Sequence, residues 1–217
     1  MGLQYHIIPV TPYQQNCSLL WCDETMKGAV VDPGGDLHLI RDAIKQFGVD
    51  LEKILVTHGH LDHVGAVHEF NLETGVPIEG PHEEDLFWIN MLQQQALMMS
   101  FPSNSQPFKS DRYLKQGDTV SVGNETLEVR HCPGHTPGHV VFYSEPARLL
   151  VAGDVLFNGS IGRTDFPRGD FETLKAAIKR ELWSLPADVE FIPGHGPMST
   201  IGHERATNPF VADSQYG

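Results

Sequence analysis

A short stretch of the chain, Thr57 to His63, carries three histidines and one aspartate within six residues. It directly follows the apolar run 54–56, so a buried strand is predicted to end at this cluster. Imidazole nitrogens and carboxylate oxygens are the donors that suit zinc, iron and manganese. The stretch offers more donors than one tetrahedral ion can use, which predicts a site for two metal ions. The alternative interpretation is a polar surface turn rich in histidine.

Single donor side chains recur at the ends of other strand-like runs. They are Asp32, His135, Asp154 and His195. In a βαβ unit the two strands are parallel, and ligands gather beyond the carboxyl ends of those strands. Together with 58–63, these turns form a candidate metal-binding constellation. His131 and His139 flank it in sequence, and either outer contacts to the site or strand-end packing would explain them.

Strand-like and helical patterns alternate along the chain. Strands are predicted at 5–10, 16–22, 29–32, 53–56, 76–79, 119–122, 126–130, 140–143, 149–151 and 189–192. Helices are predicted after the N-cap Asp36, from near Asp62 to Gly75, over 83–99, and after the N-cap Asp170. Their apolar positions place Leu72 on an inward face. The segment Ser100–Ser110 is predicted to be a mobile loop.

The predicted helix 83–99 is apolar on more than one side. Its Met91, Met98 and Met99, together with Trp88, fit either core packing or the lining of a substrate pocket or an interface.

The length, charge and cysteine content of the chain limit the classes of function that it can have. The 217 residues suffice for one large α/β domain, predicted to span 1–217. Acidic residues outnumber basic ones 28 to 15, and the formal charge of −13 argues against nucleic acid and anionic membrane surfaces as partners. Three cysteines without a C-x-x-C pair fit a reducing compartment. With no secretory signal and no apolar run of about 20 residues, a soluble, cytoplasmic protein is expected.

Taken together, the donor-bearing turns resemble the metallo-β-lactamase superfamily. Thr57 to His63 matches its T-H-x-H-x-D-H pattern in full. The run 133–138 is similar to its third ligand motif, 153–154 to its bridging aspartate, and 194–196 to its last histidine. The resemblance implies a four-layered αβ/βα sandwich of two mixed β-sheets flanked by helices. It also implies two divalent metal ions, zinc first, with iron or manganese as alternatives.

The same resemblance implies a ligand set, in which metal 1 is held by His58, His60 and His135, metal 2 by Asp62, His63 and His195, and Asp154 bridges both. Two of these residues would also be catalytic. Asp62 would orient the attacking water, and Asp154 would fix the separation of the metals. Thr57 and Thr136 are expected to hydrogen-bond ligand carboxylates.

Within the superfamily, the chain resembles the glyoxalase II group, in particular the short bacterial YcbL type that lacks the C-terminal helical domain. The implied function is hydrolysis of a small glutathione thioester, S-D-lactoylglutathione, to D-lactate and glutathione. The segment 162–166 is equally similar to the persulfide dioxygenases. An iron-dependent persulfide dioxygenase and a non-catalytic metal-binding interaction domain therefore stay as alternatives, and the oligomeric state is open.

Two further expectations follow from the comparison of branches. The chain is unlike the true β-lactamases, which have another ligand where Asp154 stands. An anionic thiol conjugate would need local positive charge, for which Arg163, Arg168, Lys109 and Arg112 are the candidates.

Overall fold

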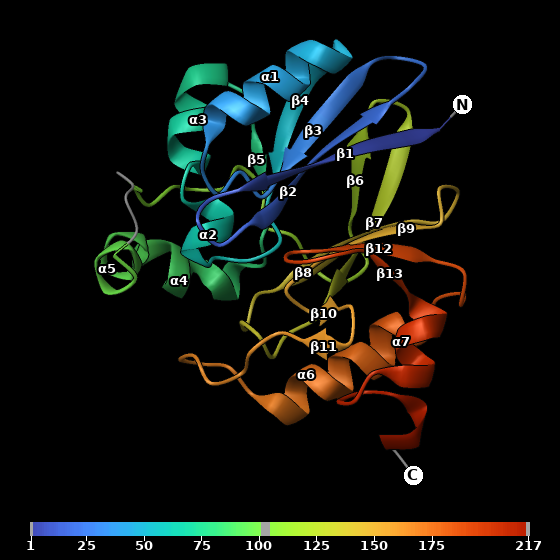
Figure 1. The fold of residues 1–217 in the computed structure, drawn as a ribbon. Helices are drawn as coiled ribbons and strands as arrows, with labels where there is room; N and C mark the ends of the chain where they lie inside the picture. The colour runs from blue at the N-terminus through green and yellow to red at the C-terminus, as the bar shows by residue number, and fades with distance from the viewer. Residues whose placement is uncertain (1, 101–104, 216–217) are drawn as a thin grey trace.

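A computed structural model describes residues 2–100 and 105–215, and two large β-sheets form its centre (Figure 1). The first sheet contains β1 (Leu3–Val10), β2 (Gln15–Cys22), β3 (Lys27–Val31), β4 (Asp50–Leu55) and β5 (Ile78–Glu79), in that order. The second contains β6 (Thr119–Val122), β7 (Glu125–His131), β8 (Val140–Ser144), β9 (Leu149–Gly153), β12 (Glu190–Pro193) and β13 (Ser199–Thr200). Its order is β13-β12-β9-β8-β7-β6. A separate hairpin pairs β10 (Leu156–Phe157) with β11 (Ser160–Ile161).

Both large sheets are mixed. In the first sheet β3, β4 and β5 run parallel, whereas β1, β2 and β3 pair antiparallel. In the second sheet only β9 and β12 are parallel. Parallel strands end at the same edge of a sheet, so the turns after β3, β4, β9 and β12 are brought to common edges.

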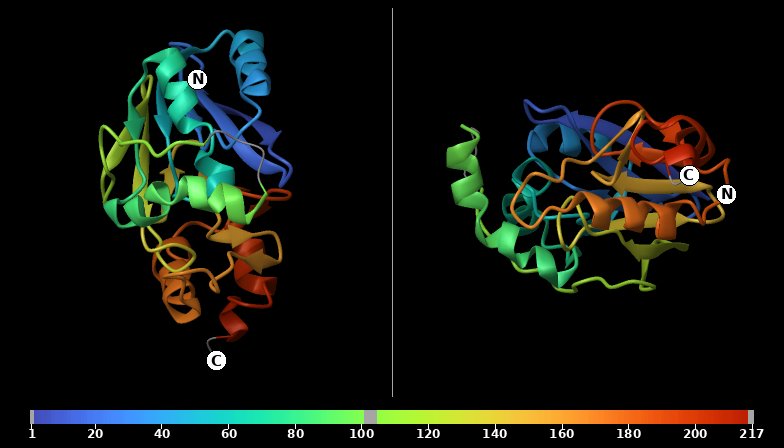
Figure 2. Two further views of the ribbon diagram at one scale, coloured as in Figure 1. Left: turned by 90° about the vertical axis from the view of Figure 1, so that its left-hand side faces the viewer. Right: turned by 90° about the horizontal axis from the view of Figure 1, so that it is seen from below.

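Helices cover the outer faces of both sheets (Figures 1 and 2). On the first-sheet side lie α1 (Leu37–Phe47), α2 (Leu61–Val64) and α3 (Val67–Thr74). On the second-sheet side lie α6 (Phe171–Ala177), the π-helical turn η2 (Ile178–Leu182) and α7 (Ile201–Thr207). The remaining helical pieces are η1 (Glu83–Asp85), α4 (Leu86–Asn90), α5 (Leu92–Met98) and η3 (Asp213–Gln215). The four-layered arrangement predicted from the sequence is confirmed.

Alternating side chains of the central strands build three cores. Leu19 of β2 packs toward α1, while its neighbour Leu20 packs between the two sheets. In β8, Val141 faces the α6 side and Phe142 faces the space between the sheets. Successive strand residues point to opposite faces, so strands that are covered on both sides read as continuous apolar runs.

The predicted helices differ from the structure in three details. The helix expected from near Asp62 to Gly75 is broken into α2 and α3, and Leu72 is 72% exposed rather than buried. The helix expected over 83–99 is divided into η1, α4 and α5. Asp36 occupies the N-cap position of α1 as predicted, but its carboxylate does not bond the first helical turn, because the backbone is left-handed there and the carboxylate accepts the Thr11 N–H at 2.7 Å.

Part of the predicted mobile loop can be assessed. Residues 101–104 lie outside the described residues. Ser105 donates its hydroxyl to the carbonyl of Gly65, Ser110 donates to that of Gly80, and both serines are buried. The end of the segment is therefore anchored to the body of the protein. Within the described ranges, no helix has the length and apolar character that a membrane span requires.

Candidate metal centre

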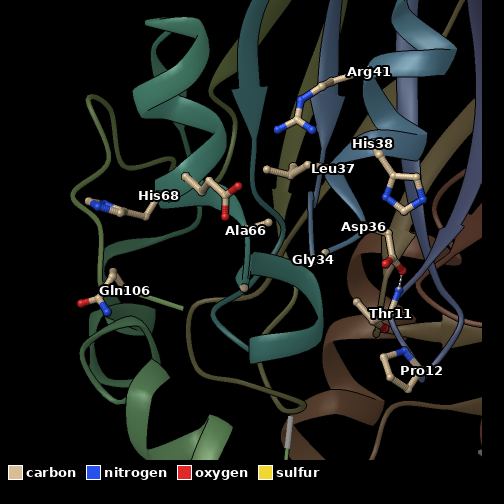
Figure 3. Close-up of a pocket in the computed structure, with 13 residues that line it drawn as sticks. Thr11, Pro12, Gly34, Asp36, Leu37, His38, Arg41, Ala66, His68 and Gln106 are labelled. Atoms are coloured by element: carbon tan, nitrogen blue, oxygen red, sulfur yellow. Dashed lines mark hydrogen bonds between the residues drawn. The ribbon is translucent and has the colours of Figure 1, made fainter. Parts of the chain in front are cut away.

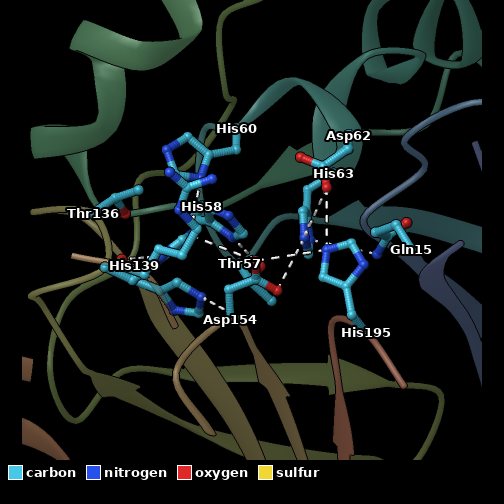
Figure 4. Close-up of polar contacts among 12 residues, drawn as sticks. Gln15, Thr57, His58, His60, Asp62, His63, Thr136, His139, Asp154 and His195 are labelled. Carbon is cyan, nitrogen blue, oxygen red and sulfur yellow. Dashed lines mark hydrogen bonds and ion pairs between the residues drawn. The ribbon is translucent and has the colours of Figure 1, made fainter. Parts of the chain in front are cut away.

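The turns after the parallel strands bring the predicted ligands together (Figure 4). The stretch 57–63 follows β4 and runs into α2, and His135 lies in the turn between β7 and β8. Asp154 directly follows β9, and His195 is the second residue after β12. Four ligand positions therefore come from the first-sheet side and three from the second.

The donor atoms form two groups, each with its atoms within 4.8 Å of one another. The groups are His58, His60 and His135, and Asp62, His63 and His195. Asp154 reaches both groups. Its Oδ1 lies 3.2 Å from Nε2 of His63, and its Oδ2 lies 3.5 Å from Nε2 of His135.

Several of these buried atoms have no hydrogen-bond partner among the described residues. They are Nε2 of His58, His60 and His63, and Oδ1 of Asp154. A buried polar atom without a partner costs about 1–3 kcal/mol. At His60 it is Nδ1 that lies against the first donor group, 2.9 Å from Nε2 of His135. Nitrogen and carboxylate oxygen donors gathered in this way fit divalent cations.

The far side of most rings contacts a hydrogen-bond acceptor. Nδ1–H of His63 donates to Oδ2 of Asp32 (2.8 Å). Nδ1–H of His135 donates to the carbonyl of Arg163 (2.7 Å), and Nδ1–H of His195 donates to the carbonyl of Tyr13 (3.1 Å). A proton held on Nδ1 leaves the lone pair on Nε2, which faces the centre. These outer contacts fix both the tautomer and the angle of each ring.

Asp32 is hydrogen-bonded to His63 directly and to His58 through the hydroxyl of Thr57. Its Oδ1 accepts the N–H of Thr57 at 2.8 Å, and its Oδ2 accepts the Thr57 hydroxyl at 2.5 Å as well as Nδ1–H of His63. The Thr57 hydroxyl oxygen lies 3.0 Å from Nδ1 of His58 and can accept its proton. Asp32 has a φ of 53°, which is rare outside glycine, and these bonds hold it there.

Asp85 joins the two turns that carry the first donor group. Its buried carboxylate accepts the N–H of Gly59 (2.8 Å), the N–H of Gly138 (2.6 Å) and the hydroxyl of Thr136 (2.8 Å). Burial raises the pKa of Asp85 to about 6. Sequence reasoning missed this residue, because the acidic run 83–85 before an apolar segment has the pattern of an ordinary first helical turn.

Two sequence expectations are corrected by these contacts. Thr57 and Thr136 were expected to bond ligand carboxylates, but they bond Asp32 and Asp85, which lie outside the predicted ligand set.

The two flanking histidines behave differently. His139 is buried, its Nε2 accepts the backbone N–H of Asp154 at 3.0 Å, and its ring stacks on His58 with centroids 4.5 Å apart. His131 stacks on His82 and hydrogen-bonds the carbonyl of Pro137. Only His139 therefore makes direct contact with the predicted ligands.

Burial sets the protonation state of the histidines. It lowers the pKa of His58, His60 and His135, which keeps these imidazoles neutral, the form that binds metals. Burial acts in the same direction on His63, but the carboxylates of Asp154 and Asp62 outweigh it and raise the pKa of His63 well above its usual range.

Asp154 is held in the ionised form. Burial alone would raise its pKa, but the neighbouring His63 and His135 outweigh burial and hold the pKa of this carboxyl well below its usual range. A carboxylate that stays charged in a buried place suits a position between two cations.

A cavity of about 500 Å³ opens beside the donor groups. Five of the seven predicted ligands line it, namely His60, Asp62, His135, Asp154 and His195. Of the four basic residues expected near the site, only Arg163 lines this cavity. Arg168 lies over the ring of Phe87, and Arg112 hydrogen-bonds Glu79.

A second cavity, of about 620 Å³, lies at the start of α1 (Figure 3). Thr11, Asp36, His38, Arg41 and His68 are among the residues that line it. It contains none of the seven predicted ligands, so the chemistry of the centre belongs to the first cavity.

Comparison with known proteins gives a consistent picture. The model of the "Metallo-beta-lactamase superfamily" matches residues 10–195. The chain is 44% identical over 210 residues to hydroxyacylglutathione hydrolase GloC of Haemophilus influenzae, covering 96% of this chain and 98% of that protein.

Two solved structures are similar in both sequence and fold. The B3 metallo-beta-lactamase BLEG-1 is 34% identical with a TM-score of 0.88, and the match covers 96% of this chain and 99% of BLEG-1. TTHA1623, solved in a di-iron-bound form, is 35% identical with a TM-score of 0.86, and the match covers 94% and 99% of the two chains.

Proposed function

The chain belongs to the metallo-beta-lactamase superfamily, and on that premise we propose that it is a metal-dependent thioester hydrolase of the glyoxalase II type. The reaction is hydrolysis of S-D-lactoylglutathione to D-lactate and glutathione. One observation carries the proposal: two groups of buried or partly buried donors lie within reach of Asp154, and five of these seven residues line a cavity of about 500 Å³. The similarity to a named hydroxyacylglutathione hydrolase supports the choice of thioester.

The proposed ligand set follows the two donor groups. His58, His60 and His135 would hold one cation, Asp62, His63 and His195 the other, and Asp154 would contact both. When bound, two divalent cations polarise a thioester carbonyl and lower the pKa of water toward about 7. We propose zinc first, and a di-iron-bound relative makes iron the next metal to test.

The remaining chemistry falls to the protein's own side chains. Asp62 lines the cavity, and its Oδ2 lies 3.1 Å from Nε2 of His195. The pKa of Asp62 is lowered because the neighbouring His63 and His195 outweigh its burial, so its carboxylate can accept a hydrogen bond from the attacking water and orient it. Cleavage of the C–S bond releases glutathione as a thiolate. Because the pKa of a thiol is only about 8.5, the thiolate can leave without being protonated by a general acid.

Loss of one ligand should remove metal and activity together. We expect His58→Ala and Asp154→Ala to retain less metal by elemental analysis and to lose hydrolysis of S-D-lactoylglutathione, because each leaves other buried donors uncompensated. His203→Ala changes an exposed histidine of α7 and serves as the control. Activity at the wild-type level in either ligand variant would show the mechanism to be wrong.

The same preparation can decide between competing reactions. Oxygen uptake with glutathione persulfide by an iron-loaded sample would favour the dioxygenase alternative. A β-lactam substrate belongs in the assay, because BLEG-1 is named as a β-lactamase. Metal binding without any of these activities would favour the non-catalytic interaction domain.

We also propose one domain over 1–217 and a cytoplasmic location. All three cysteines are free and buried, which supports a reducing compartment.

A further inference from the structure

An apolar wall stands directly against the first donor group. The ring of Trp88 lies 4.6 Å from that of His60, and the ring of Phe166 lies 5.1 Å from it on another side. The wall is completed by apolar side chains that line the same cavity, namely Met91, Met98, Met99, Phe157 and Pro167. An apolar group bound here would therefore lie next to the reacting centre.

The wall offers little charge to a substrate. Apart from the histidines, Arg163 is the only basic side chain among the described residues that line the cavity. It lies over the ring of Phe166 at 4.4 Å and is paired with Asp165 at 2.8 Å. Both side chains are about two-thirds exposed, at 66% and 68%, so the ion pair between them contributes little free energy to this part of the cavity.

Hydrogen bonds fix the wall relative to the donor groups. Gln95 of α5 accepts the N–H of Leu61 at 3.0 Å, and its side-chain amide donates to the carbonyls of Trp88 (2.9 Å) and Gly59 (3.3 Å). At the rim, the hydroxyl of Tyr13 donates to the carbonyl of Met99. The methionine-bearing segment is thus attached to the stretch that carries the ligands.

We propose that this wall binds the acyl group of the substrate, and that the site takes, besides the small lactoyl thioester of the proposed reaction, a class of thioesters with a large apolar acyl group. The inference rests on the proposed thioester hydrolysis. A thioester whose carbonyl lies at the centre places its acyl chain within reach of the cavity wall. Methionine side chains are flexible and polarisable, so they adapt to apolar groups of different shape.

Binding of two thioethers that cannot be hydrolysed tests the proposal. S-hexylglutathione and S-methylglutathione share the thiol and differ only in the apolar group at the acyl position. We expect the metal-loaded full chain to bind S-hexylglutathione at least about tenfold more tightly, because burial of each methylene is favourable. Isothermal titration measures both Kd values. Equal affinities, or tighter binding of S-methylglutathione, would overturn the inference.

Substitutions in the wall test whether the preference for S-hexylglutathione arises from these side chains. We expect Met91→Gln combined with Met98→Gln to reduce the preference to about threefold or less, because amides in the wall are desolvated by an apolar chain. Leu97→Gln is the matched control, since Leu97 neighbours Met98 on α5 and is as exposed as Met98 (82% against 80%), but does not line the cavity. An unchanged preference in the double methionine variant, with metal content as in the wild type, would contradict the proposal.

The rate on S-D-lactoylglutathione separates this inference from the proposed reaction. Hydrolysis of that thioester with equal affinities for the two thioethers would overturn the apolar specificity alone. A strong preference for S-hexylglutathione without thioester hydrolysis would overturn the proposed reaction and support the apolar ligand class.

Discussion

At the scale of single residues, two aspartates outside the predicted ligand set organise the centre. Asp32 connects to both His58 and His63 through the hydroxyl of Thr57 and its own Oδ2. Asp85 connects the turn of Gly59 to the turn of Gly138. The orientation of the His58 and His63 rings therefore depends on Asp32, and Asp85 holds together the two turns that carry the first donor group.

Removal of the Asp32 charge should weaken metal binding. In Asp32→Asn one acceptor oxygen becomes an NH2 group, so the side chain can no longer accept from both the Thr57 N–H and Nδ1–H of His63. Loss of such outer contacts typically costs about 10–100-fold in metal affinity. Chelator competition measures this affinity. Asp36→Asn is the matched control, because Asp36 also has a positive φ and accepts one backbone N–H, from Thr11. Equal affinities in both variants would contradict the role of Asp32.

Asp85 should give the metal-free protein a distinctive pH dependence. Its pKa is raised from 3.8 to about 6, so between these values the folded state binds a proton more tightly than the unfolded chain. The stability from this group is present below pH 3.8 and is lost as the pH rises through 6.

Relative to Asp85→Asn, the free energy of unfolding of the wild type should therefore fall by about 2 kcal/mol between pH 4 and 7. Urea denaturation in the presence of a chelator measures both curves. The other titrating groups are shared by the two proteins and cancel in the difference. Parallel curves would show that Asp85 has no raised pKa.

At the scale of elements, the turn between β3 and α1 supports α2. A Cβ atom on Gly34 would lie 1.6 Å from the carbonyl oxygen of Asp62, so only glycine permits this approach. The neighbouring Gly35 is less constrained, because its Cβ would meet only the Thr11 side chain, at 3.0 Å at the closest. The position of Asp62 and His63 thus depends on the β3–α1 turn.

Gly34→Ala should displace α2 and impair the second donor group. We expect a loss of at least about 1–3 kcal/mol in the free energy of unfolding, because the added methyl group overlaps with backbone. Metal content should also fall, since Asp62 and His63 move with α2. Gly35→Ala should cost less in both measurements, and an equal cost for the two alanine variants would count against the close approach.

At the scale of the whole molecule, the centre joins the two sheets. His58, His60, Asp62 and His63 follow β4 of the first sheet, whereas His135, Asp154 and His195 lie on turns of the second. Cations bound here would cross-link the two halves of the sandwich and neutralise carboxylates in a protein of charge −13. Metal binding and global stability should therefore be coupled.

Metal removal should lower the melting temperature. A cation at about 1,000 times its Kd stabilises the folded state by about 4 kcal/mol, which corresponds to a shift on the order of 10 °C for a chain of this length. Differential scanning calorimetry with and without a chelator measures the shift. His58→Ala should respond much less to the chelator. An identical response of the two proteins would mean that metal at this centre does not stabilise the fold.

The sequence was most informative where local pattern and chemistry coincide. Strand-like and helical runs predicted the order of the main elements up to β9, and the histidines and aspartates after some of these strands marked the turns that hold all seven candidate ligands. The sequence did not predict the strands β10, β11 and β13, because each has only two residues and so shows no hydrophobic periodicity. It also did not predict the helix α7, which lies in a polar segment. Metal binding by the seven residues stays a prediction.

By itself, the sequence determined the identity and spacing of the donors, because they lie within a few residues of strand ends that hydrophobic periodicity reveals. Only the tertiary structure decided what surrounds them. Asp85 is 26 residues from Gly59 and 53 from Gly138, and no local pattern encodes such distances. The same holds for Trp88 and the three methionines, which in the sequence fitted either core packing or the lining of a pocket or an interface, and which line the cavity once α4 and α5 pack beside the ligands.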